Sequence, residues 1–223
     1  MNLLPGWLPH SNTVNLLAGG FLLSGLLVVT RRRPLEVVGA LRVNAIALAL
    51  IALTVSLATG AWHIALAALL AFVVKAGVIP ALLETRARRM SGEVRSYVNL
   101  PTGALICGAL VVVAFSQTRE LFGSRSDILA ACLPISVAVT LIGLFVMVTR
   151  RQALMQVVGL VLLENAIFLA AVSLTYGMPL VVEAGVLMDL MAGVALLGLF
   201  VQRIDEALGQ GDGDATSLKG LKG

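Results

Sequence analysis

The chain has 223 residues, of which 59% are hydrophobic and only 13% are charged. A soluble domain carries about 25% charged residues, so this composition excludes an ordinary soluble protein and indicates an integral membrane protein. The net charge is +4, but the basic residues cluster at the ends of apolar stretches and form no continuous face, which argues against nucleic-acid binding. Cys107 and Cys132 lie in apolar segments without ligands at suitable spacing, so no metal site, cofactor site or catalytic centre is expected in this chain.

Seven apolar stretches of about 20 residues predict an all-α integral membrane protein with seven transmembrane helices. In chain order they are Asn12–Thr30, Pro34–Ala58, Ala61–Leu83, Tyr97–Ser116, Asp127–Thr149, Ala153–Tyr176 and Pro179–Gln202. Pro80 and Pro134 fall within two of these stretches and are expected to kink or locally open the third and fifth helices.

The basic residues predict how the chain is oriented. Twelve fall on one side of the membrane: Arg31, Arg32, Arg33, Arg86, Arg88, Arg89, Arg95, Arg150, Arg151, Arg203, Lys219 and Lys222. The other side has only Arg119 and Arg125. The positive-inside rule then places the N-terminus outside and the C-terminus in the cytoplasm, which in a bacterium means the inner membrane. The basic loop Glu84–Ser96 is expected at the anionic lipid surface or against a soluble partner.

Short segments recur about 120 residues apart along the chain. Val29–Arg32 returns as Val148–Arg151, Val37–Gly39 as Val157–Gly159, and Asn44–Ile46 as Asn165–Ile167. The recurrence predicts a parallel repeat in which helices one to three match helices five to seven. The chain then divides into a first repeat with the basic loop (1–96), a linking fourth helix with an outer loop (97–126), a second repeat (127–204) and a flexible cytoplasmic tail (205–223).

Five ionisable residues lie inside the apolar stretches, where each costs about 2.5–3.5 kcal/mol near the membrane centre. They are Arg42, Lys75, Glu164, Glu183 and Asp189. At 1.5 Å per residue, Glu164 and Asp189 come near the midplane on consecutive helices, so their carboxyls are expected to face each other or to share a partner. Lys75 and Arg42 lie about 12 Å from the cytoplasmic ends of their helices, and Glu183 lies about one turn from the outer surface.

Two interpretations of these charges remain open. Such groups in a low-dielectric interior can exchange protons near neutral pH, as a relay requires. Alternatively they form fixed interhelical ion pairs, for example Lys75 with Glu164 or Asp189. Arg42 can snorkel to the cytoplasmic face or pair with a neighbouring subunit, and water at the outer surface can solvate Glu183.

Uncharged residues are expected to join the helices to one another. The repeat-related Asn44 and Asn165 are expected to hydrogen-bond between helices rather than bind a ligand. Glycines such as Gly19, Gly20 and Gly103 are expected to allow close helix packing.

Four groups of residues resemble the hydrogenase-4 component E family, the membrane subunits of formate-hydrogenlyase-type, group 4 [NiFe]-hydrogenase complexes. They are Val74 and Lys75 followed by Ile79 and Pro80; Leu162–Asn165; Val182–Gly185 followed by Asp189; and Ser217–Gly223. The resemblance covers nearly the whole chain. It implies antiporter-like large membrane subunits, a complex-I-like junction subunit and a peripheral redox arm as partners. The iron–sulfur clusters and the [NiFe] centre would lie in those partners.

The last three predicted helices also resemble the three-helix small subunit of respiratory complex I, chain 4L. In that family, glutamates on the second and third helices belong to the hydrophilic axis used in proton pumping. Glu164 matches the first position approximately, because the usual site after a Gly-Leu pair is Val161 here, and Asp189 stands near the second as an aspartate. The resemblance implies a non-catalytic subunit that contributes to proton or sodium translocation. A purely structural subunit and a stand-alone small transporter are the alternatives.

Overall fold

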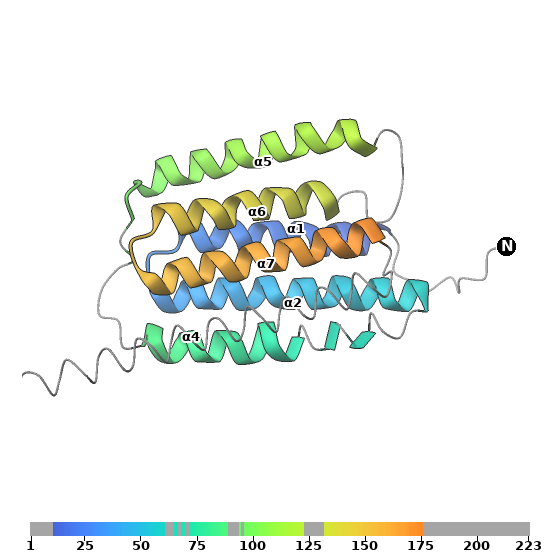
Figure 1. Ribbon diagram of the computed structural model, residues 1–223, viewed down its shortest axis with the longest axis horizontal. Coiled ribbons are helices and arrows are strands. Elements are labelled where there is room, and N and C mark those ends of the chain that lie inside the picture. Colours follow the sequence, from blue (N-terminus) through green and yellow to red (C-terminus); the bar gives the residue numbers. More distant parts are fainter. Residues whose placement is uncertain are drawn as a thin grey trace, which may run out of the picture. The chain divides into compact units, whose positions relative to one another are not determined.

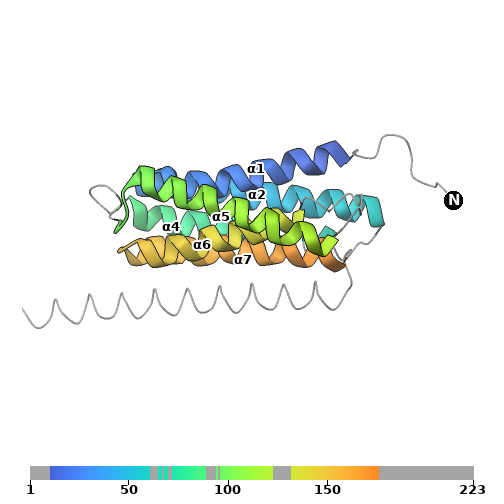
Figure 2. The same ribbon diagram turned by 90° about the horizontal axis from the view of Figure 1, so that it is seen from above.

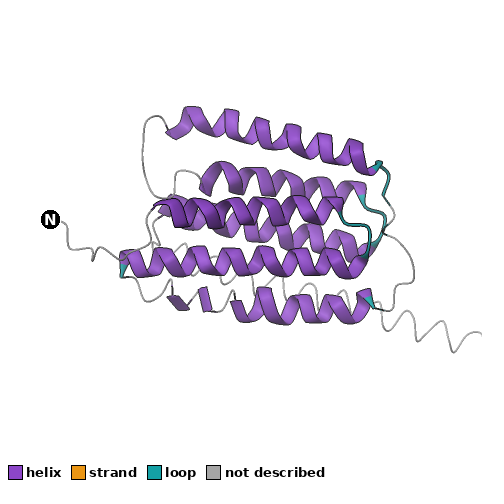
Figure 3. Ribbon diagram, turned by 180° about the vertical axis from the view of Figure 1, so that it is seen from behind, coloured by secondary structure: helices purple, strands orange, loops and turns teal. Residues whose placement is uncertain are grey.

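The computed structural model describes residues 11–60, 65–66, 68–69, 72–88, 94, 96–122 and 132–175. All of them belong to one compact unit, Met1–Gly185. Every secondary-structure element among them is a helix, as Figure 3 shows. The predicted seventh helix, Pro179–Gln202, and the tail from 205 onward lie outside the described residues.

Five of the described helices are long and apolar enough to cross a membrane. They are α1 (Ser11–Thr30), α2 (Pro34–Thr59), α5 (Leu100–Phe122), α6 (Cys132–Thr149) and α7 (Ala153–Thr175). They correspond to predicted helices one, two, four, five and six, with ends that differ by no more than a turn or two. The described part of the chain therefore has the all-helical architecture of a membrane protein.

The third predicted helix is interrupted by a π-helical segment. Its continuously described part consists of the π-helix η1 (Phe72–Val78) followed by α4 (Ile79–Ala87). Pro80 is the second residue of α4, and its missing N–H removes one hydrogen bond of the α-helical pattern. A π-helix is wound more loosely than an α-helix, so the local opening expected at Pro80 is confirmed. Pro134 is the third described residue of α6, and residues 123–131 before it lie outside the described part, so the kink expected there stays a prediction.

The two ends of α2 follow from its sequence. Pro34 occupies the first turn, where a missing N–H leaves no gap in the helix. The helix ends before Gly60, whose φ of 69° is left-handed and whose N–H bonds the Ser56 carbonyl at 2.9 Å. Glycine adopts this conformation without a steric penalty, which fixes the length of the helix.

The centre of the unit is formed by α1, α2, α6 and α7, with α1 packed on α2 and α6, and α7 packed on α6 and α2. At one edge α5 packs on α6 and α1, and at the opposite edge η1 and α4 pack on α2 (Figures 1 and 2). The closest approach involves two glycines: a Cβ placed on Gly143 of α6 would lie 2.9 Å from the carbonyl oxygen of Gly159 on α7.

These two glycines are not the ones expected from the sequence. A Cβ on Gly19 or Gly20 would meet nothing within 4 Å, and one on Gly103 would meet Phe145 and Val29 at an ordinary 3.8 Å. The glycines of α6 and α7 therefore set the tightest helix packing that the structure describes.

The end of the basic loop is fastened to both helical turns on its side of the bundle. The Val94 N–H donates to the Arg32 carbonyl at 2.7 Å, and the Tyr97 N–H donates to the Thr149 carbonyl at 2.9 Å. Ser96 forms a β-bridge with Arg150. The turn between α1 and α2 and the turn between α6 and α7 are thus held together by the segment that leads into α5.

Candidate functional site: a buried lysine–glutamate pair

Lys75 is almost completely buried, with 1% of its side chain exposed. Its Nζ lies 3.6 Å from Oε1 of Glu164 on α7, whose side chain is 12% exposed. The same nitrogen lies 5.3 Å from the centre of the Phe168 ring. The carboxylate and the ring face both attract an ammonium group. The π-helical segment thus places a positive charge against α7 inside the apolar bundle.

The position of these side chains follows from helical spacing. Glu164 and Phe168 are four residues apart on α7, so they share one face and meet Lys75 together. Asn165 is the next residue after Glu164, about 100° further round the helix, and it faces α2. One turn of α7 therefore makes two polar contacts, one from Glu164 to η1 and one from Asn165 to α2.

The second contact of α7 is a line of hydrogen bonds through three helices. Asn165 Nδ2 donates to Asn44 Oδ1 on α2 at 3.0 Å. Asn44 Nδ2 donates to the Phe21 carbonyl at 3.0 Å and to Ser24 Oγ at 3.1 Å, both on α1. Both asparagines are completely buried. The prediction that they hydrogen-bond between helices is confirmed.

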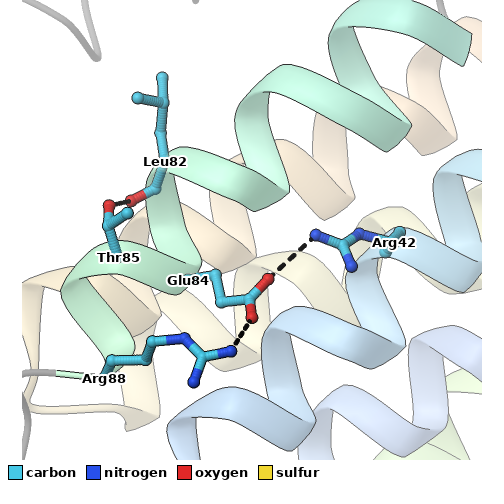
Figure 4. A network of polar contacts seen from close by, with 5 residues as sticks. All are labelled: Arg42, Leu82, Glu84, Thr85 and Arg88. Atoms are coloured by element: carbon cyan, nitrogen blue, oxygen red, sulfur yellow. Dashed lines mark hydrogen bonds and ion pairs between the residues drawn. The ribbon is translucent and has the colours of Figure 1, made fainter.

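Arg42 lies in a separate cluster with Glu84 and Arg88 (Figure 4). Its Nη2 is 3.1 Å from Oε2 of Glu84 on α4, and Arg88 donates to the other oxygen of Glu84 at 2.6 Å. The hydrogen bond from Arg88 has the largest effect on the Glu84 carboxyl, and the one from Arg42 the next largest. Together they hold the pKa of this carboxyl below its ordinary value. Arg42 therefore finds its counter-ion within the chain and needs no neighbouring subunit for it.

The structure brings together only some of the predicted site residues. Lys75 meets Glu164, which is one of the pairings that the sequence left open. Arg42 pairs with Glu84 instead of joining them. Glu183 and Asp189 lie outside the described residues, so the expected meeting of Glu164 and Asp189 stays a prediction.

Three contributing residues were missed by the reading of the sequence: Glu84, Phe168 and Ser24. Glu84 precedes Arg88 by four residues, and Phe168 follows Glu164 by four, so helical spacing signals both. Ser24 carries no such signal, because its contact with Asn44 joins two helices 20 residues apart in sequence.

Within the described part of the chain, no group of three or more His, Cys, Asp or Glu side chains is placed to hold a metal ion. The Lys75–Glu164 pair consists of one proton donor and one proton acceptor in apolar surroundings. Such a pair can hold a proton on either partner, but it cannot carry out electron transfer.

Apolar helices around a buried ion pair define the class of the molecule as a multi-span helical membrane protein. The chain is 32% identical over 215 residues to uncharacterized protein Rv0085 of Mycobacterium tuberculosis, covering 94% of this chain and 96% of that protein. It is 25% identical over 215 residues to hydrogenase-4 component E of Escherichia coli K12 and of Shigella flexneri, covering 96% of this chain and 99% of each relative. The chain is a homologue of Rv0085, and its similarity to hydrogenase-4 component E along nearly the whole chain supports an assignment to that family. No family model and no solved structure matches it.

Proposed function

We propose that the chain is a non-catalytic membrane-arm subunit of a complex-I-like hydrogenase or formate hydrogenlyase complex. In this proposal its buried charges form part of an axis that moves protons, or sodium ions, when electrons pass through partner subunits. Similarity to hydrogenase-4 component E along nearly the whole chain supports the kind of complex. The Lys75–Glu164 pair is the observation that supports the role in translocation.

The pair has the chemistry that a relay step needs. A lone charge in an apolar interior is costly, but a proton that passes from an ammonium to a neighbouring carboxylate converts an ion pair into a neutral pair. Both states keep the net charge of the site at zero. When the neutral lysine takes up a proton from one side as the glutamic acid releases its proton to the other, the ion pair is restored and the site holds no uncompensated charge.

Other residues of the axis are assigned from the sequence. Asp189 and Glu183 would continue the path from Glu164 toward the outer surface, and Arg42 would act near the cytoplasmic side. The partners would be antiporter-like membrane subunits, a complex-I-like junction subunit and a peripheral arm that carries the iron–sulfur clusters and the [NiFe] centre. The chain would lie in the inner membrane, with its N-terminus outside and its C-terminus in the cytoplasm.

We further propose seven membrane spans and a parallel repeat, in which residues 1–96 and 127–204 form equivalent halves. Two features support the repeat. Asn44 and Asn165 are corresponding positions, and they hydrogen-bond to each other. The corresponding helices α1 and α6 also pack on one another, as do α2 and α7.

The translocation role is tested by Glu164→Gln in the intact complex. The amide keeps the size of the side chain but cannot carry a proton. We expect the variant complex to assemble and transfer electrons, with coupled ion movement into sealed vesicles strongly reduced. Glu36→Gln is the matched control, because Glu36 is an exposed acid that pairs with Arg31 at 3.5 Å. Normal ion movement in Glu164→Gln would remove this residue from the relay.

A structural role is the second candidate, and the contact between Lys75 and Phe168 favours it. A ring beside the ammonium adds an attraction that holds the side chain in one place. In this case Lys75→Ala would impair assembly of the complex. If the role is structural, the exchanged pair Lys75→Glu with Glu164→Lys would restore both assembly and ion movement. If the pair is a relay that needs the lysine and the glutamate at their own positions, the exchange would restore assembly but not ion movement.

A further inference from the structure

A cavity of about 200 Å³ lies where the turns between α1 and α2 and between α6 and α7 meet the beginning of α5. Its polar wall consists of Arg32, Ser96, Asn99 and Arg150, and its apolar wall includes Val98 and Phe145. Among the wall residues that the structure describes, two are arginines and none is acidic. The described part of the wall therefore favours an anion.

Arg150 contributes most to this preference for an anion, because its positive charge is buried. It is only 7% exposed, and its guanidinium donates to the Val29 carbonyl in the last turn of α1. Burial lowers its pKa. Within the described residues, Arg150 forms no ion pair with a carboxylate. A buried guanidinium that has only a carbonyl as partner retains a desolvation cost that a neighbouring anion would reduce.

The backbone at the start of α5 also favours an anion in the cavity. Leu100 and Gly103, in the first turn of α5, also belong to the wall. The 23-residue helix α5 directs the positive end of its dipole toward this end of the bundle. The arginine side chains and the helix therefore attract the same kind of group.

We propose that this cavity binds a phosphate group, presented by the headgroup of an anionic phospholipid. Guanidinium groups bind phosphate oxygens in a bidentate manner, and Ser96 and Asn99 offer neutral polar contacts. The cavity lies at the ends of membrane-spanning helices, on the side that carries most of the arginines. Its volume is below the roughly 300–1,000 Å³ typical of drug-sized ligands, which suits a single headgroup with its glycerol against Val98 and Phe145. This inference does not depend on the proposed function.

The test uses the full-length chain, purified in detergent and freed of lipid. Phosphatidylglycerol, phosphatidylcholine and inorganic phosphate are the probes, with binding measured by native mass spectrometry and by the shift in thermal unfolding. Arg150→Gln removes the buried charge. Asn99→Asp adds a carboxylate to the wall without changing the size of the side chain, and aspartate is well accepted at the start of a helix. Arg151→Gln is the control, because Arg151 is exposed, stacks on Tyr97 at 4.0 Å and does not belong to the wall.

We expect phosphatidylglycerol to bind the wild type and Arg151→Gln equally, and to bind Arg150→Gln and Asn99→Asp about tenfold more weakly. Stabilisation by inorganic phosphate with the same dependence on the variants, but without retained lipid, would identify a soluble phosphate as the ligand and still support the phosphate site. If Arg150→Gln fails to fold, Asn99→Asp decides. Equal binding of the probes by the wild type and Asn99→Asp would overturn the proposal.

Discussion

Asn165 on α7 donates a hydrogen bond of 3.0 Å to Asn44 on α2, and these two residues, 121 positions apart, are equivalent in the predicted repeat. Asn44 continues the line to Ser24 and to the Phe21 carbonyl on α1. Both residues are completely buried, so the Asn44 Oδ1 acceptor and the Asn165 Nδ2 donor satisfy each other away from water. The three helices are thereby fixed in register at one depth of the bundle.

The coupling between the two asparagines can be measured directly. Asn44→Leu and Asn165→Leu should each destabilise the protein by about 1–2 kcal/mol. Their combined effect should fall short of the sum by about 0.6–1.7 kcal/mol, the range found for hydrogen bonds inside membrane proteins. Unfolding of the four proteins in detergent gives these values. Asn15→Leu, at an exposed position of α1, is the control and should change little. Strictly additive effects would show that the amides do not interact.

The buried ion pair predicts a different pattern. Lys75→Met removes the ammonium that lies 3.6 Å from the Glu164 carboxylate, and breaking a buried ion pair in this way should cost about 3–5 kcal/mol. The double variant Lys75→Met with Glu164→Leu removes both charges and should be more stable than Lys75→Met alone. Thermal unfolding of the single and double variants in the same detergent checks this order. A double variant less stable than either single one would contradict a direct pairing.

The glycine contact between α6 and α7 predicts that a single methyl group has opposite effects at different positions. Gly143→Ala would push a Cβ to 2.9 Å from the Gly159 carbonyl and 3.0 Å from the Leu163 nitrogen, and backbone atoms cannot easily move away. We expect a loss of about 1–3 kcal/mol, typical of overpacking. Gly39→Ala, in open space on α2, should instead stabilise the helix by about 0.5–1 kcal/mol. Equal stability of the two variants would exclude a tight α6–α7 contact.

Hydrophobic length was enough to predict the five helices that the structure describes as membrane-crossing, because a bilayer demands about 20 apolar residues whatever the neighbours are. The buried charges stood out for the same reason. The sequence predicted that Lys75 could pair with Glu164 or with Asp189, and the pairing with Glu164 is one of these two. The choice between Glu164 and Asp189 depends on how helices rotate against each other, which spacing along one chain does not determine.

Contacts between distant segments account for what the sequence did not predict. Glu84 was assigned to a basic loop, yet it lies on α4 and neutralises Arg42, 42 residues earlier. Arg150 was counted among the charges that orient the chain, but its side chain turns inward to bond the end of α1. Gly143 and Gly159, rather than the glycines of α1, form the close contact, because only packing against a neighbour distinguishes one glycine in an apolar helix from another.

The cluster of Arg42, Glu84 and Arg88 predicts how stability depends on pH. Its hydrogen bonds hold the pKa of Glu84 below the ordinary 4.5 in the folded protein. The contribution of this carboxylate is therefore fully present above about pH 4.5 and is lost as the pH falls through the lower, folded-state pKa. Glu84→Gln should be less stable than the wild type near neutral pH, and the difference should shrink as the pH falls from about 4.5 toward 3. Thermal unfolding across this range measures the stability difference, with Glu36→Gln as a control that removes an acid but leaves the cluster intact.

High salt should reduce the stability difference between Glu84→Gln and the wild type, since both arginines and the carboxylate are partly exposed to solvent. A difference between Glu84→Gln and the wild type that stays constant down to about pH 3 would show that these charges do not stabilise the fold.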